Sequence, residues 1–219
     1  MARMARLVVP GYPHHVTQRG SRRQTTFFCS DDYEAYLRLL AKAAETASVD
    51  VWAYCLMPNH VHLILVPADE SGLAAFLSEA HRRYARRINA REGWRGHLWQ
   101  ERFYSCVMDE RHLLMAARYV ELNPVRSEIC QRPEQWKWSS VHAHLKGHDD
   151  SIVKVAPMLE RVGNWREYLE IEANEREFDS LREHSRSGRP IGDSTFVEDL
   201  ERWTGRRLRR AKPGPRKVD

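Results

Sequence analysis

The sequence predicts an α+β protein in which a small antiparallel sheet is backed by helices and followed by a helical C-terminal extension. The main evidence is an alternation of short β-rich runs with longer segments whose apolar residues recur at helical spacing. A second observation is a pair of apolar runs, 49–57 and 60–67, joined by Pro58-Asn59, which predicts a hairpin central in its sheet. With 219 residues, 42% of them hydrophobic, the chain is long enough to bury a core.

The elements are expected in the order strand, helix, strand, strand, helix, strand, helix. Residues 12–20 alternate and end at glycine, which predicts the first strand. Helical spacing predicts a helix over 30–48 and a second that begins at Ser71 and breaks at Gly93. Residues 98–108 are typical of a strand or bent hairpin, and a third helix begins at Asp109 and stops at Asn123-Pro124.

We place the end of the main domain near residue 145. This gives a domain over 1–145, a helical accessory region over 146–205 and a basic tail over 206–219, which we expect to be disordered on its own. Within the accessory region, helices are expected in 153–173, 178–184 and 196–203, with 185–190 as a linker.

The distribution of charge favours a polyanionic partner. The net charge is +5, residues 1–30 hold five arginines and no acid, and 199–219 hold eight Lys or Arg against three acids. Residues 149–180 are acidic by comparison. Basic segments attract phosphates and release counterions, so nucleic acid is the expected partner, although each basic run taken alone is equally typical of solvated surface.

The same composition argues against a secreted or membrane protein. The four cysteines are widely spaced and form no CxxC pair, and no run reaches the ~18–20 apolar residues of a membrane span. The N-terminus lacks the apolar stretch of a signal peptide. We therefore expect a cytoplasmic protein with reduced thiols.

His60 and His62 are the most informative pair of residues. In a strand, residues two apart point to the same face, about 7 Å apart at Cα, so both imidazoles can converge on one metal ion. The alternative is a pair of hydrogen-bonded core histidines. A histidine-triad hydrolase is disfavoured because Ile64 stands where the third histidine would be. A metal-dependent nuclease remains, in which the metal polarises a phosphodiester.

Tyr119 is the best candidate for the nucleophile of such a nuclease. It lies in the third predicted helix, and Asn123 follows one turn later on the same face. A phenol and an amide oxygen can therefore reach the same place above the histidines. Taken singly, Tyr119 is more typical of a core residue and Asn123 of a helix end before proline.

The segments MPNHVHLI (57–64) and RYVELNPVR (118–126) resemble the single-tyrosine HUH transposases. More narrowly, the chain is similar to the REP-associated tyrosine transposases of bacteria, a branch of the IS200-like transposases. Further agreement lies in 10–20, 96–100 and 136–140, so the resemblance covers about residues 1–145. Five motifs in one order are far more specific than any single one.

The resemblance implies a ferredoxin-like fold, a Mg²⁺ or Mn²⁺ ion and transesterification on single-stranded DNA. It assigns His60 and His62 as metal ligands, Tyr119 as the nucleophile and Asn123 as the third ligand, where many insertion-sequence relatives have glutamine. Tyr119 would attack a phosphodiester and leave a 5′-phosphotyrosine and a free 3′-OH.

The expected DNA partner is a single strand or hairpin, from palindromic repeats, bound by a monomer or a homodimer. Phosphate contacts are expected from arginines after the first strand and on one face of the second helix: Arg19, Arg22, Arg23, Arg82, Arg83, Arg86 and Arg87. Two alternative functions stay open. One is a domesticated endonuclease that processes chromosomal repeats, and the other is a nucleic-acid-binding regulator with a vestigial site.

Overall fold

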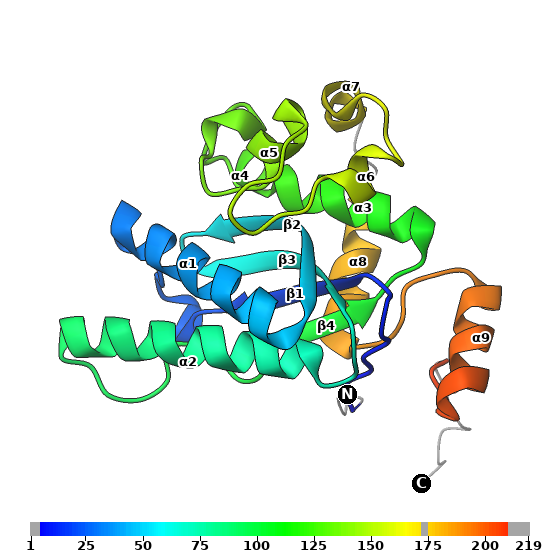
Figure 1. The fold of residues 1–219 in the computed structure, drawn as a ribbon, viewed down its shortest axis with the longest axis horizontal. Helices are drawn as coiled ribbons and strands as arrows, with labels where there is room; N and C mark the ends of the chain where they lie inside the picture. The colour runs from blue at the N-terminus through cyan, green and yellow to red at the C-terminus, as the bar shows by residue number, and fades with distance from the viewer. Residues whose placement is uncertain (1–4, 172–174, 210–219) are drawn as a thin grey trace, which may run out of the picture.

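A computed structural model describes residues 5–171 and 175–209. One antiparallel sheet has the strand order β2-β3-β1-β4. Its strands are β1 (His14–Arg19), β2 (Val49–Met57), β3 (His60–Pro67) and β4 (Tyr104–Val107). The helices α1 (Ser30–Ala47) and α2 (Gly72–Glu92) cover one face, while α3 (Glu110–Glu121) and α8 (Glu175–Ser187) cover the other (Figure 1). The predicted α+β, ferredoxin-like fold is confirmed.

The remaining described elements are short and lie mostly in the C-terminal part. They are the 3-10 turns Ser21–Arg23 and Pro133–Gln135, and the helices α4 (Asn123–Arg126), α5 (Val141–Lys146), α6 (Ala156–Leu159), α7 (Trp165–Glu170) and α9 (Ser194–Thr204). The predicted helical extension is thus present.

The alternation of side chains along β3 separates the two faces of the sheet. Val61, Leu63 and Leu65 pack with α1 and α2 in the larger core cluster. His62 and Ile64 point the other way, and Ile64 packs in the cluster that contains α3 and α8. The sheet therefore presents its histidines on the α3 face, because a strand has a period of two.

Two boundaries differ from the sequence prediction. The fourth strand spans only Tyr104–Val107, since Leu98, Trp99 and Phe103 are buried as loop residues in the core rather than as a strand. The third helix ends at Glu121, and the predicted stop residue Asn123 instead begins α4.

Two further expectations prove wrong. The predicted hairpin is not central, because β2 is an edge strand of the sheet. Isolated bridges from β2 to Val153 and Ser139 pair part of its outer edge. The predicted linker 185–190 begins inside α8, where Ser185 is buried. Of the predicted disordered tail, Leu208 is buried against Leu7 and Val9, while 210–219 lie outside the described residues.

The expectations about cysteine and membrane spans can also be compared with the structure. All four cysteines are free thiols. Within 5–171 and 175–209, none of the helices has the length and apolar character required to cross a bilayer.

A buried carboxylate fixes the C-terminal end of α3. Glu121 accepts hydrogen bonds from Ser140 Oγ (2.5 Å), His144 Nδ1 (2.6 Å) and Trp165 Nε1 (2.7 Å). Its side chain is fully buried, so three charge-assisted bonds hold α3 to α5 and α7. At the other end, Asp109 caps α3 by accepting from the His112 backbone N–H (2.9 Å). These contacts fix both ends of α3, the helix that packs over the histidines of β3.

Candidate metal-binding and nucleophile site

The floor of the candidate site is formed by His60 and His62 on β3. Their ring centroids are 5.0 Å apart and the rings are nearly perpendicular, at 81°. The antiparallel register with β1 places Arg19 opposite His60 and Thr17 opposite His62. The two imidazoles therefore share one face of the sheet, as their spacing predicts.

The hydrogen bonds made by Nδ1 of His60 and of His62 direct the Nε2 atom of each ring toward the candidate metal site. His60 Nδ1 lies 2.6 Å from Asn59 Oδ1, an oxygen that can only accept, so this nitrogen donates. The Asn59 amide nitrogen bonds the Arg23 carbonyl, which supports that orientation. His62 Nδ1 lies 3.0 Å from His15 Nε2. With a proton on both Nδ1 atoms, both Nε2 atoms carry a lone pair that can accept a hydrogen bond or bind a metal.

His15 extends this arrangement toward α8. Its ring stacks on that of His62, at 5.3 Å between centroids and 3° between planes. His15 Nδ1 lies 2.7 Å from Ser185 Oγ. One set of tautomers satisfies both hydrogen bonds: His62 donates to His15, and His15 donates to Ser185. Because neighbouring residues of a strand point to opposite faces, only one of His14 and His15 can reach this face, and that residue is His15.

Asn123 and Tyr119 contact the histidines from the side of α3 and α4. Asn123, the first residue of α4, donates from Nδ2 to His62 Nε2 at 3.4 Å. The Tyr119 ring lies edge-on to the His62 ring with centroids 5.3 Å apart. All four residues predicted from the sequence are thus brought together, with His62 in contact with the other three.

Tyr119 is covered by α8 and is only 5% exposed. Its ring contacts Phe178 (centroids 5.2 Å apart), and its hydroxyl accepts a hydrogen bond from Arg182 Nε at 3.3 Å. Arg126 from α4 lies over the same ring, with its guanidinium carbon 5.3 Å from the centroid. The phenol oxygen is therefore held close to positive charge.

Burial keeps the imidazoles neutral. It lowers the pKa of His15 to about 3. Burial, with a smaller effect from Arg19, lowers the pKa of His60 to about 4. Burial also lowers the pKa of His62 well below its usual range, assisted by its histidine and arginine neighbours. At neutral pH all three rings are in the form that metal ligation requires.

The donor set fits a divalent cation if Asn123 supplies its amide oxygen. Two Nε2 lone pairs converge from β3, and rotation of the Asn123 amide would bring Oδ1 to the position of Nδ2, since the two atoms are distinguished only by their hydrogen bonds. No group of three His, Cys, Asp or Glu side chains that could hold a metal exists in the described part of the chain. The third ligand would therefore be the amide.

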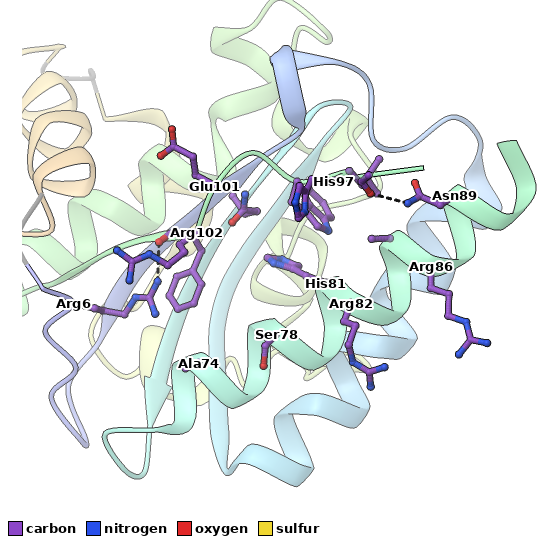
Figure 2. A pocket seen from close by; sticks show the side chains of 16 residues that line it. Arg6, Ala74, Ser78, His81, Arg82, Arg86, Asn89, His97, Glu101 and Arg102 are labelled. Carbon is purple, nitrogen blue, oxygen red and sulfur yellow. Dashed lines mark hydrogen bonds between the residues drawn. The ribbon is translucent and has the colours of Figure 1, made fainter. Parts of the chain in front are cut away.

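The predicted DNA-binding arginines occupy two faces of the molecule. Arg19 is the last residue of β1 and lies opposite His60, and Arg22 and Arg23 lie in the 3-10 turn that follows. Arg82 and Arg83 on α2 both pair with Glu79. Arg82 and Arg86 also line a pocket of about 580 Å³ between α2 and residues 96–103, on the opposite face of the sheet (Figure 2).

Sequence reasoning missed Ser185, Arg182 and Arg126. Two of these come from α8, more than fifty residues after Tyr119, in a region without any chemical motif. The amphipathic spacing of 178–184 indicates a helix but cannot say which part of the sheet the helix covers. Arg126 stands within the segment RYVELNPVR, yet its position over Tyr119 depends on the turn between α3 and α4.

The fold and this site place two histidines on a central strand and a tyrosine on the helix that packs over them. Residues 9–123 match the family described as IS200-like transposases. The match covers more than half of the chain, and the protein belongs to this family.

Two relatives extend this finding. A Haemophilus influenzae protein assigned as a REP-associated tyrosine transposase is 21% identical over 134 residues, which are 56% of this chain and 76% of that protein. The solved structure of a REP-associated tyrosine transposase bound to a REP hairpin aligns with a TM-score of 0.58 at 17% identity. That alignment covers 70% of this chain and 92% of the other, and it supports the fold.

Proposed function

We propose that this protein is a metal-dependent transposase or endonuclease that cleaves and rejoins hairpin-bearing single-stranded DNA through Tyr119. The observation that carries the proposal is the contact of His62 with His60, Tyr119 and Asn123 within one chain. The proximity of a tyrosine to two imidazoles and an amide supports the proposal, because phosphoryl transfer needs an oriented nucleophile and positive charge at the phosphate.

In the proposed reaction, the Tyr119 hydroxyl oxygen attacks a DNA phosphorus atom. An O–P bond forms to the tyrosine, and the bond from phosphorus to the 3′ oxygen breaks. The phenol proton is lost to solvent, and the departing 3′ oxygen takes up a proton. The product is a 5′-phosphotyrosine and a free 3′-OH, which can attack the phosphotyrosine in the reverse direction without an external energy source.

The proposed cofactor is Mg²⁺ or Mn²⁺, held by His60, His62 and the amide oxygen of Asn123. When bound, the ion supplies positive charge to the non-bridging oxygens of the phosphate. The protein's own contribution is to keep both imidazoles neutral and directed at one point. Mg²⁺ is bound almost entirely through oxygen ligands, whereas this site offers two nitrogens, so a stronger response to Mn²⁺ is expected.

The proposed substrate is a hairpin from a palindromic repeat. Its support is the likeness to a transposase solved with a REP hairpin, together with the basic residues that flank both the site and α2. A single chain contains the whole candidate site, which supports a monomer as the active form.

The test mixes the purified protein and Mn²⁺ with labelled single strands that carry the palindromes flanking its gene. Wild-type protein should form a covalent adduct that survives denaturation, and Tyr119→Phe should form none while binding the DNA normally. An adduct of equal yield in Tyr119→Phe would refute the role of this tyrosine.

A second candidate function, binding without cleavage, is favoured by one observation. Tyr119 is only 5% exposed, so its hydroxyl has little access to solvent in this conformation. A regulator that binds the same repeats would retain the basic surfaces but form no adduct with any strand. Tight binding by wild type with no adduct in Mn²⁺ or Mg²⁺ would support this second function.

A further inference from the structure

The surroundings of Tyr119 contain a cluster of arginines that the proposed metal site does not use. Arg182 on α8 donates from Nε to the Tyr119 hydroxyl at 3.3 Å. The guanidinium of Arg126 lies 5.3 Å from the Tyr119 ring centroid and 4.5 Å from that of Phe178. Both cations therefore contact the nucleophile, from α4 and from α8.

Further positive charge reaches the same place from the sheet and from α8. Burial lowers the pKa of the Arg19 guanidinium, and the charges of Arg23 and Arg186 lower it further. Arg19 is paired with His60 across β1 and β3, so its charge lies beside the site. Several guanidinium groups are therefore gathered near Tyr119, where an anion would be attracted.

The acidic partners of these arginines are exposed and neutralise them weakly. Arg182 pairs with Asp179 at 2.5 Å, and Arg126 pairs with Glu175 at 2.6 Å. The two carboxylates are 69% and 62% exposed, where an ion pair contributes little. Phosphate oxygens could therefore compete for the same guanidinium groups.

Arg126 also has an unsatisfied donor. Its Nη1 is buried without a hydrogen-bond partner among the described residues, and a buried N–H without an acceptor costs free energy. Packing of the guanidinium on two aromatic rings explains its position but leaves this donor unexplained. An anion beside Tyr119 would supply the missing acceptor.

We propose that Arg126 and Arg182 form a phosphate-binding site that holds the non-bridging oxygens of the DNA phosphodiester attacked by Tyr119. This inference rests on the proposed function and adds to it a substrate contact from α8. Guanidinium groups suit phosphate because they present planar, paired donors. Both residues lie beyond the segment 9–123 that matches the family, so the C-terminal region contributes directly to the site.

The test measures binding rather than cleavage. In the full-length Tyr119→Phe background, a neutral methylphosphonate is placed at each phosphate in turn of the strand beside the hairpin, and the affinity is measured by fluorescence anisotropy. At one position the methylphosphonate should weaken binding about 10- to 100-fold, the effect of losing a charge-assisted hydrogen bond.

At that same position, adding Arg182→Gln should abolish most of the penalty, because the variant no longer has the guanidinium that binds this phosphate. Arg182→Lys should keep an intermediate penalty, since it retains the charge but not the paired donors. Arg126→Gln is the second variant, and Arg38→Gln on α1 is the matched control, because Arg38 is an exposed arginine remote from the site. Circular dichroism checks that each variant is folded.

The outcomes separate this inference from the proposed function. The phosphate site is overturned if methylphosphonate weakens binding equally at every position, both in the Tyr119→Phe protein and in its Arg126→Gln and Arg182→Gln versions. This holds even if wild type forms the tyrosine adduct. Loss of a position-specific penalty in Arg182→Gln supports the site, even if no adduct forms. The absence of adduct in wild type would then contradict only the proposed cleavage.

Discussion

At the scale of single residues, the orientation of His62 depends on groups that never touch the proposed metal. The hydrogen bonds of the His62 ring decide which of its two nitrogens carries the proton. His15 Nε2 accepts a hydrogen bond from His62 Nδ1 at 3.0 Å, and His15 is itself held by Ser185 at 2.7 Å. Ser185 is therefore two hydrogen bonds away from the ligand nitrogen.

Ser185→Ala should weaken Mn²⁺ binding by about 10-fold, the lower end of the effect of losing a partner of a metal-ligating histidine. Without the Ser185 hydroxyl, the His15 ring can turn or change tautomer. His62 Nδ1 then loses its acceptor, and the proton can move to Nε2. The measurement is Mn²⁺ titration followed by electron paramagnetic resonance. Ser78→Ala, an exposed serine on α2, should bind as wild type does. Equal affinities for all three proteins would show that Ser185 plays no part.

At the scale of elements, α3 carries Tyr119 and is positioned by Glu121. Three donors from α5, α7 and the turn before α5 meet this one carboxylate. Glu121→Ala would leave those donors buried without an acceptor. We expect a loss of unfolding free energy of about 3–5 kcal/mol, as for breaking other buried charge networks.

Urea denaturation of Glu121→Ala measures this loss. Glu121→Gln should lose less, because an amide oxygen still accepts, and Glu45→Ala on the exposed side of α1 should change the midpoint little. A midpoint for Glu121→Ala within error of Glu45→Ala would mean that the network does not stabilise α3.

The helix α2 provides a second basic surface, across the sheet from Tyr119. Arg86 and Arg87 line it together with Arg82 and Arg83, and only the latter pair is neutralised by Glu79. If α2 binds DNA phosphates, the double variant Arg86→Ala with Arg87→Ala should weaken binding of every strand. The slope of log Kd against log salt should fall by about 0.7–0.9 for each phosphate that the variant no longer neutralises.

Anisotropy titrations at several salt concentrations measure that slope. Arg38→Ala on α1 is a suitable comparison, because it removes one exposed arginine from a different helix. An unchanged slope in the double variant would exclude α2 from the DNA interface.

At the scale of the whole molecule, local patterns predict the sheet and its helices better than they predict the site. The alternation in β3 and the spacing in α1 and α2 depend on neighbours in sequence, so β2, β3 and both helices are close to their predicted bounds. The position of α8 depends on which part of the histidine-bearing face of the sheet α3 leaves uncovered, which no local pattern contains. Ser185 and Arg182 are therefore found only in the structure.

Acid should destabilise the protein, because the folded state buries several neutral imidazoles. Burial lowers the pKa of His14 and His60 to about 4, and of His15 and His81 to about 3. In the unfolded chain each has a pKa near 6.5. His14 illustrates the reason: its Nδ1 bonds the Tyr12 carbonyl and its Nε2 accepts from the Val9 N–H, so the ring has no place for a second proton.

These low pKa values fix the direction of the pH dependence. Above pH 6.5 the rings are neutral in both states, and their contribution to stability is complete. Between pH 6.5 and about 4 the unfolded chain takes up protons that the folded chain refuses, so the unfolding free energy falls as pH falls. Each imidazole contributes about 1.4 kcal/mol per pH unit in this window.

Urea unfolding at pH 7.5, 6 and 5, with EDTA present to remove metal ions, should show this fall. His81→Gln should flatten the dependence by one proton, since His81 on α2 has its Nε2 2.9 Å from the Tyr36 hydroxyl and desolvation lowers its pKa to about 3. His148→Gln, at an exposed position, should leave the dependence as in wild type. A stability that stays constant from pH 7.5 to 5 would contradict the neutral, buried state of these histidines, and with it the basis on which one of them, His60, is proposed to bind a metal.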